Sequence, residues 1–270
     1  AGLTSAVDAI FADDGPLTRA LPHFEPRDGQ RVMARAVAET LEHGGVLLAE
    51  AGTGTGKTLA YLVPAILSGR RVLVSTGTKN LQEQIYFKDL PVLRQALGVP
   101  FTATYMKGRA NYLCLHRLQQ ARGAAGAVGD ELEQIAAWAE TSETGDRAEL
   151  EDLPESSPLW HDISATADTC LGSDCPQFQE CFVTRMRQRA AASDLVIVNH
   201  HLLCADAAVR QSSYGEVIPA GHYAVVDEAH QLEDVATQYF GTAVSNYRLD
   251  DLGRDVERVL NAGVLADDDG

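Results

Sequence analysis

One segment of this 270-residue chain constrains the fold more than any other, a glycine- and threonine-rich stretch from Glu50 to Thr58. The apolar run Val46–Ala49 before it predicts a strand, and the residues after it predict a helix over Lys57–Leu67. A strand, a glycine loop and a helix in this order are typical of a loop that binds phosphate through backbone N–H groups at a helix N-terminus.

The loop residues have distinct expected roles. The Lys57 ammonium would reach the β- and γ-phosphates of a nucleotide, and the Thr58 hydroxyl would ligate Mg²⁺. Ala51 stands where the strict phosphate-loop pattern has its first glycine, and the alternative to a nucleotide site is an ordinary turn before a helix. The expected nucleotide site comprises Gly52, Thr53, Gly54, Thr55, Gly56, Lys57 and Thr58.

Apolar runs alternate with helical patterns along most of the chain. Besides Val46–Ala49, the predicted strands are Val72–Ser75, Phe101–Tyr105, Leu195–Val198 and Ala224–Val226. Nearly continuous apolar runs favour strands buried on both faces of a parallel sheet. A first helix ends near His43, and further helices are predicted over Lys57–Leu67, Lys79–Ala96, Glu131–Glu140, Phe178–Ala192 and Gln231–Tyr239. The chain therefore predicts an α/β fold with a doubly wound parallel sheet.

The alternation stops between Gly108 and Asp194, where no strand is predicted. This length exceeds an ordinary connection, so residues 108–193 are interpreted as a mostly helical insertion. Residues 126–180 carry −13 of the formal net charge of −16. The rest of the chain is nearly neutral, and the acidic total does not exclude a nucleic-acid partner.

A second acidic motif follows the last predicted strand, at Asp227-Glu228-Ala229-His230. Asp227 is a candidate Mg²⁺ ligand, and Glu228 is a candidate base that orients the water attacking the γ-phosphate. The alternative is a polar helix N-terminus, where acidic side chains are favoured in any protein.

Four of the five cysteines lie in the insertion, with 55, 4 and 5 residues between successive members. Thiolate quartets bind zinc or an iron–sulfur cluster, and one distant ligand with three grouped ones fits a cluster better. Four unconnected buried thiols are the alternative. The quartet comprises Cys114, Cys170, Cys175 and Cys181. So few cysteines do not make a disulfide scaffold, and we expect a cytoplasmic protein.

The motifs together resemble those of DinG-like helicases, in the superfamily 2 branch that includes the XPD iron–sulfur helicases. Beside the phosphate loop, the cysteines and the acidic motif, the resemblance rests on Arg27–Gln30, Ser75–Thr78, Lys107–Cys114 and Asn199-His200. These matches run in family order from about residue 24 to residue 240.

The resemblance implies a RecA-like P-loop motor domain that binds ATP with Mg²⁺ and carries a [4Fe–4S] cluster on the four cysteines. It implies that Gln30 reads the adenine edge, with Arg27 beside it. Residues 1–107 and 194–240 would form the motor, residues 108–193 the cluster insertion, and residues 241–270 the start of another helical insertion or a disordered tail. His200 is expected to be packed or hydrogen-bonded.

DNA contacts are expected in two places. Thr76 and Thr78 follow a strand, where hydroxyls would touch a DNA backbone, although capping of the next helix explains them equally well. Basic side chains adjoin the predicted cluster on both sides, and the alternative for them is a solvated helix face. These are Lys107, Arg109, Arg185, Arg187 and Arg189.

The expected function is that of an ATP-dependent DNA helicase fragment, monomeric and not in a membrane, acting on single-stranded or forked DNA. The resemblance implies a second motor domain that this chain lacks, and a role in DNA repair. Two other functions stay open. One is a metal-containing nucleic-acid-binding module without motor activity, and the other is a P-loop transferase with structural zinc.

Overall fold

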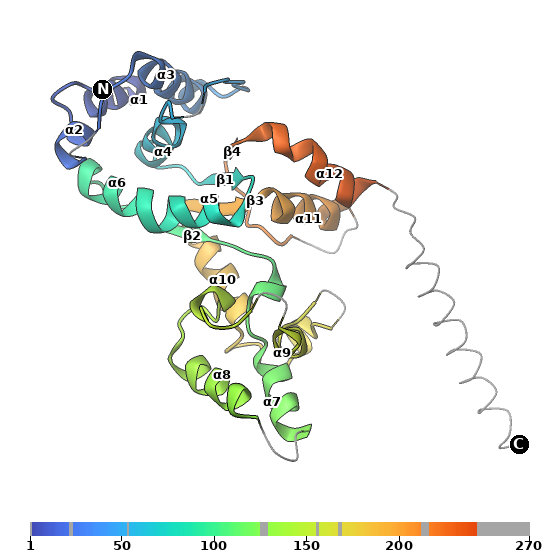
Figure 1. The fold of residues 1–270 in the computed structure, drawn as a ribbon. Coiled ribbons are helices and arrows are strands. Elements are labelled where there is room, and N and C mark those ends of the chain that lie inside the picture. The colour runs from blue at the N-terminus through green and yellow to red at the C-terminus, as the bar shows by residue number, and fades with distance from the viewer. Residues whose placement is uncertain are drawn as a thin grey trace, which may run out of the picture.

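The computed structural model describes residues 2–21, 24–52, 54–124, 129–154, 157–166, 169–211 and 216–241. Four strands there form one parallel sheet, in the order β2-β3-β1-β4 (Figure 1). They are β1 (Val72–Thr76), β2 (Ala103–Tyr105), β3 (Leu195–Asn199) and β4 (Tyr223–Val226). The predicted α/β fold with a parallel sheet is confirmed, as are four of its five strands.

Strand β3 connects two apolar cores. All five of its residues are buried, and it pairs with β1 from Val72↔Leu195 to Thr76↔Asn199. Because strand side chains alternate between faces, Leu195 and Ile197 belong to one core and Val196 and Val198 to the other. The continuous apolar run is therefore explained by burial on both faces.

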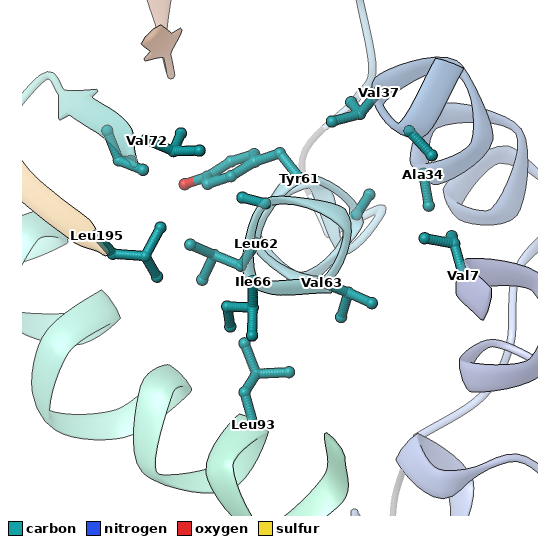
Figure 2. Close-up of a cluster of buried hydrophobic side chains, with 14 of the residues drawn as sticks. Val7, Ala34, Val37, Tyr61, Leu62, Val63, Ile66, Val72, Leu93 and Leu195 are labelled. Atoms are coloured by element: carbon teal, nitrogen blue, oxygen red, sulfur yellow. The ribbon is translucent and has the colours of Figure 1, made fainter. Parts of the chain in front are cut away.

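The first core lies under helices α1 (Leu3–Ile10), α2 (Pro16–Ala20), α3 (Asp28–His43), α4 (Lys57–Leu67) and α6 (Leu90–Leu97). Figure 2 shows α4 in the middle of this core, with Leu62 and Ile66 near Leu195 and Leu93, and Val63 directed toward another part of the core. Every residue from Ala60 to Ile66 is buried. A helix that is apolar on all sides is expected in such a position.

The second core lies on the opposite side of the sheet (Figure 1). Its helices include α7 (Leu115–Ala124), α8 (Asp130–Thr141), α9 (Pro158–Ile163), α10 (Phe182–Ala191) and α11 (His200–Gln211). The described residues between 108 and 193 contribute helices and turns but no strand of the sheet. The boundaries of the insertion stay a prediction.

One predicted helix is interrupted in the structure. The helix expected over Lys79–Ala96 is divided into α5 (Lys79–Gln84), a π-helical turn (Ile85–Asp89) and α6. Pro91 in the first turn of α6 has no N–H to continue the hydrogen-bond ladder, which explains the interruption. The remaining predicted helix near the end of the described chain is α12 (Leu232–Phe240).

The prediction of a strand over Val46–Ala49 is wrong for this structure. Val46 is 90% and Leu48 is 93% exposed, and the segment pairs with no strand of the described sheet. A strand exists only where a neighbour supplies hydrogen bonds, which a local apolar run does not guarantee. The predicted tail falls on residues 242–270, outside the described residues. No helix in the described ranges is long and apolar enough to span a bilayer.

Candidate nucleotide site and its surroundings

The glycine loop connects the extended segment before it to α4. Gly54 and Gly56 have φ angles of 76° and 79°, a backbone conformation that favours glycine. The Thr55 hydroxyl donates to the Gly52 carbonyl at 2.8 Å, which holds the loop closed on itself. Thr53, also predicted as a loop residue, lies outside the described residues.

Lys57 opens α4 and points back across the loop. Its ammonium donates to the Ala51 carbonyl at 3.1 Å and lies 3.3 Å from Oε1 of Glu228. The phosphate-loop cation and the acidic motif, far apart in sequence, are therefore neighbours. An ammonium beside free helix N–H groups is the arrangement that attracts phosphate.

Two residues of the α3 region support the same loop from the other side. Arg27 donates a hydrogen bond to the Gly54 carbonyl, and Gln30 Nε2 donates to the Gly56 carbonyl at 2.9 Å. Gln30 is buried, and a Cβ placed on Gly56 would lie 2.1 Å from its Nε2 atom. The structure thus brings both predicted nucleotide-binding side chains to the loop.

The acidic motif begins directly after β4. The Asp227 N–H donates to the Ser75 carbonyl at 2.8 Å, and Oδ1 of Asp227 accepts from the Glu228 N–H at 3.0 Å. Glu228 has φ 53°, the one positive value among the described non-glycine residues. Such backbone strain concentrates at functional sites. With the Thr58 hydroxyl, the Asp227 carboxylate supplies the hard oxygen ligands that Mg²⁺ prefers.

His200 lies buried beneath this motif. Its Nδ1 is 2.7 Å from the Ser75 hydroxyl, which confirms the expected packed and hydrogen-bonded role. Burial lowers the pKa of the imidazole, although the backbone of Glu228 and Asp227 opposes that shift. His200 is therefore a neutral side chain hydrogen-bonded to β1 beneath the acidic motif, and its Nε2 is buried without a hydrogen-bond partner among the described residues.

Thr76 and Thr78 make local contacts at the end of β1. The buried Thr76 hydroxyl donates to the Thr78 carbonyl at 3.1 Å. The Thr78 hydroxyl accepts from the Leu81 N–H at 3.2 Å and caps α5. The capping alternative is confirmed for Thr78, while a DNA contact there stays a prediction.

The four cysteines of the insertion are free thiols. Cys114 directly precedes α7, and Cys181 is the N-cap of α10. Burial raises the pKa of Cys114, and the nearby Cys181 and Cys175 raise it further. Cys170 is exposed. The described residues do not gather three or more His, Cys, Asp or Glu side chains into a group that could hold a metal ion.

The arginines of α10 do not share one face. Arg185 forms an ion pair with Glu180, and Arg189, one turn later, donates to the Glu143 carbonyl at 3.2 Å. Arg187 projects to another side, where burial lowers its pKa and its Nε is buried without a hydrogen-bond partner among the described residues. Arg109, in a short turn before Cys114, is half-buried.

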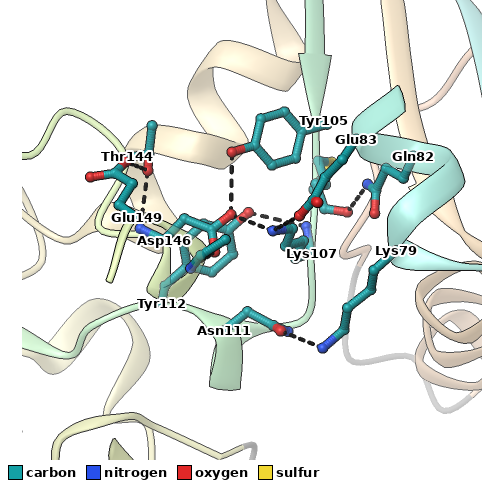
Figure 3. Close-up of polar contacts among 12 residues, drawn as sticks. Lys79, Gln82, Glu83, Tyr105, Lys107, Asn111, Tyr112, Thr144, Asp146 and Glu149 are labelled. Atoms are coloured by element: carbon teal, nitrogen blue, oxygen red, sulfur yellow. Dashed lines mark hydrogen bonds and ion pairs between the residues drawn. The ribbon is translucent and has the colours of Figure 1, made fainter. Parts of the chain in front are cut away.

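Lys107, predicted to contact DNA, is instead buried in an ion cluster (Figure 3). Its ammonium lies 2.7 Å from Oδ2 of Asp146 and 2.8 Å from Oε1 of Glu83. The Tyr105 hydroxyl donates to the same Asp146 carboxylate at 3.2 Å, and the Lys107 N–H donates to the Tyr112 hydroxyl at 3.1 Å. A charge neutralised in this way is not available to a phosphate.

The cluster joins the insertion to the sheet. Asp146 lies in the insertion, Tyr105 ends β2, and Glu83 belongs to α5. Burial raises the pKa of both Tyr105 and Tyr112, so both hydroxyls keep their protons. Sequence reasoning missed Asp146 and Glu83, because nothing in their local pattern distinguishes them from the other acids of the chain.

Comparison with known proteins gives one family. Residues 30–118 match the DEAD/DEAH box helicase family. The ATP-dependent DNA helicase YoaA of Haemophilus influenzae is 45% identical over 93% of this chain and 40% of its own length. The ATP-dependent helicase DinG of Mycobacterium tuberculosis (strain H37Rv) is 36% identical over 88% of this chain and 39% of its own length.

A third relative carries a different printed activity. The 3'-5' exonuclease DinG of Bacillus subtilis is 35% identical over 83% of this chain and 24% of its own length. The chain spans about two fifths of the length of YoaA and of mycobacterial DinG. The family resemblance predicted from the motifs is confirmed by these matches.

Proposed function

This chain belongs to the DEAD/DEAH box helicases, and on that premise we propose that it is the ATP-binding part of a DNA helicase motor. The observation that carries the proposal is the 3.3 Å approach of Lys57 to Glu228. This approach brings the phosphate-loop cation and the acid expected to activate water into one site, which supports a role in ATP binding and hydrolysis.

Each residue of the site has its own proposed role in ATP binding and hydrolysis. The backbone N–H groups of the loop and the Lys57 ammonium hold the phosphates. Thr58 and Asp227 hold Mg²⁺, which neutralises phosphate charge when bound. Glu228 orients and deprotonates the attacking water. Gln30 and Arg27, which both contact the loop, would read the base.

The test is nucleotide binding by Lys57→Ala, measured with a fluorescent ATP analogue in the presence of Mg²⁺. Binding should be lost, because the cation against the β- and γ-phosphates is removed. Lys88→Ala, at an exposed lysine of the π-helical turn, is the matched control and should bind like the wild type. Unchanged affinity in Lys57→Ala would contradict the proposed site.

We infer further that Cys114, Cys170, Cys175 and Cys181 hold a [4Fe–4S] cluster. Support comes from four free thiols in the insertion, three of which are grouped between residues 170 and 181. Soft thiolates on two chain segments fit such a cluster. Bound iron would tie the segment before α7 to the segment before α10.

Iron analysis and the visible spectrum of anaerobically purified protein test this inference. About four irons per chain and broad absorption are expected, as the cluster formula requires. Cys175→Ser should lose both, whereas Cys204→Ser, a buried thiol outside the quartet, should keep both. A colourless preparation with stoichiometric zinc would overturn the inference.

The DNA-binding surface that we propose consists of Arg109, Arg185 and Arg189. Lys107 and Arg187 are left out because burial and their neighbours make them unsuited to phosphate contact. An Arg109/Arg185/Arg189→Ala variant should bind single-stranded or forked DNA more weakly and with a smaller salt dependence. Equal binding by the wild type and this variant would place the DNA path elsewhere.

Hydrolysis, translocation and unwinding belong to the whole protein in this proposal. We propose that a second motor domain, beyond the two fifths of the relatives that this chain spans, completes the ATP site. The chain alone should bind nucleotide and hydrolyse it slowly, and adding the missing part of the protein should raise the steady-state rate.

A further inference from the structure

Tyr61 is the one aromatic residue of α4, and its hydroxyl lies beneath the nucleotide site. The hydroxyl donates to Oδ2 of Asp227 at 3.1 Å, from α4 to the end of β4. Thr58 lies one turn earlier on the same helix. The Tyr61 hydroxyl therefore holds Asp227 against the helix that carries Thr58, and these are the two residues to which the Mg²⁺ ligand role is given.

The position of Tyr61 is fixed by packing. The side chain is 2% exposed and belongs to the first core, with Val37 on one side and Val72 on the other (Figure 2). The Tyr61 hydroxyl oxygen therefore has a fixed position, 3.1 Å from Oδ2 of Asp227.

These contacts restrict the Asp227 carboxylate. Oδ2 accepts from Tyr61, while Oδ1 accepts from the Glu228 N–H at 3.0 Å. Each oxygen has a directed hydrogen bond, so the plane of the carboxylate is set before any ligand arrives. A metal ligand held in orientation by a neighbouring hydrogen bond binds its ion more tightly than a freely rotating one.

We propose that Tyr61 is a positioning residue for Mg²⁺ at the nucleotide site, holding the Asp227 carboxylate and the Thr58 hydroxyl in the relative orientation that the metal requires. The inference rests on the proposed function of the site and adds a residue to it. Tyr61 touches neither phosphate nor metal, and it acts through Asp227 and Thr58.

The experiment is a Mg²⁺ titration of nucleotide binding by the wild type and Tyr61→Phe, read from a fluorescent ATP analogue at fixed concentration. Tyr61→Phe keeps the ring in the core and removes only the hydroxyl. The Mg²⁺ concentration for half-maximal binding should rise about tenfold, the effect of one lost hydrogen bond to a charged group. Nucleotide affinity in EDTA should not change, because Lys57 and the loop are intact.

Tyr223→Phe is the matched control. Its hydroxyl donates to the Leu41 carbonyl at 2.9 Å and packs on the same first core, but it does not contact Asp227. If Tyr61 served only as a structural residue, both variants would lower the thermal midpoint while leaving the Mg²⁺ titration unchanged. A titration of Tyr61→Phe identical to the wild type overturns the inference.

Two further outcomes are decisive. A wild type that binds no nucleotide overturns the proposed function together with this inference, whereas a Mg²⁺-dependent wild type with an unaffected variant overturns the inference alone. If Tyr61→Phe does not fold, 3-fluorotyrosine placed at position 61 of the wild-type chain replaces it. Its ¹⁹F resonance must shift when Mg²⁺ is added to the nucleotide complex, and an unmoved resonance rejects the role.

Discussion

Among the described residues, Lys57 and Lys107 each pair with a carboxylate from a distant segment, and the pairs Lys57–Glu228 and Lys107–Asp146 differ in almost every physical respect. At the candidate nucleotide site, Lys57 and Glu228 lie 3.3 Å apart with side chains 22% and 28% exposed. At the junction of the insertion, Lys107 and Asp146 lie 2.7 Å apart with side chains 3% and 2% exposed. The first pair is open to an incoming ligand, while the second is closed.

The difference indicates different roles. An ion pair in contact with water contributes little to stability, and either partner can leave the other to bind a ligand. A buried pair has lost its hydration, and it is stable only while each charge keeps the other and its hydrogen bonds. Lys57 can therefore leave Glu228 for a phosphate, whereas Lys107 cannot leave Asp146 without a large energetic cost.

Replacing Lys107 with alanine should have the largest effect. Asp146 would remain buried without its cation, and the free energy of unfolding should fall by about 3–5 kcal/mol. Lys57→Ala should lower it by at most about 1 kcal/mol, because its carboxylate partner is hydrated. Urea unfolding followed by circular dichroism measures both changes.

A double variant controls for the loss of packing. Lys107→Met combined with Asp146→Asn removes both charges and keeps an acceptor for the Tyr105 hydroxyl, so part of the stability should return. Equal losses of stability in Lys107→Ala and Lys57→Ala would remove the contrast between the two pairs.

The chain just before Asp146 should be the next most sensitive position. Gly145 has φ 63°, and a Cβ added there would lie 2.3 Å from the Phe182 ring. Gly145→Ala should destabilise by about 2–4 kcal/mol, because backbone strain and overpacking add. Gly172→Ala is the matched control, with φ 59° and no atom within 4 Å of the added Cβ.

The Gly172→Ala control separates the cost of backbone strain from the cost of overpacking. Gly172→Ala should cost about 1–2 kcal/mol, the backbone strain alone. Thermal or urea unfolding of both variants gives the difference. If the two variants lose the same stability, packing against Phe182 does not hold Asp146 in place, and the closed pair depends on its charges alone.

Asp89 is a third, partly buried carboxylate to compare with Glu228 and Asp146. Its Oδ2 has no hydrogen-bond partner among the described residues. Burial raises its pKa from 3.8 to about 6, while Lys88 opposes the shift. The folded protein therefore holds a proton that the unfolded chain releases, and the ionised carboxylate destabilises the fold above pH 6.

Asp89→Asn should then stabilise the protein on the order of 1 kcal/mol at pH 8, after allowance for solvent screening. The gain should shrink as the pH falls through 6 and vanish only well below pH 3.8, where both states bind the proton. Unfolding free energies at several pH values measure it, with Glu151→Gln at an exposed position as the control. A gain independent of pH would show that the carboxylate charge is not the cause.

The sequence predicts the sheet better than it predicts the ion pairs. Apolar runs such as Leu195–Val198 were predicted as strands because burial on both faces leaves a continuous local signal. Val46–Ala49 carries the same signal and forms no strand here, since pairing depends on a neighbouring strand that comes from another part of the chain. The interruption before α6 had a local signal, Pro91, that the helical pattern concealed.

The residues of the candidate site show the same contrast between local motifs and contacts made by distant segments. Lys57, Asp227 and Glu228 were predicted because each belongs to a local motif, and the structure brings Lys57 and Glu228 together. Lys107 was assigned to DNA because it stands near Arg109 and Cys114, but its surroundings are set by Asp146 and Glu83 from other segments. The role inferred for Tyr61 had a signal too, since a hydroxyl inside the apolar helix α4 needs a buried partner.

The exposed pair Arg185–Glu180 should show the smallest effect. Its side chains are 41% and 63% exposed, so Glu180→Gln should change the free energy of unfolding by less than about 0.5 kcal/mol. Arg185 would be released from its partner, and the affinity for single-stranded DNA should rise about twofold at low salt, because a negative charge near the phosphates is removed. Fluorescence anisotropy of a labelled oligonucleotide measures the DNA affinity, again with Glu151→Gln as the control.

The gain in DNA affinity should disappear at about 1 M salt, where exposed charges are screened within about 3 Å. A stability loss as large as that of Lys107→Ala would mean that exposure does not separate the pairs of this protein, and an unchanged DNA affinity would remove Arg185 from the proposed DNA-binding surface.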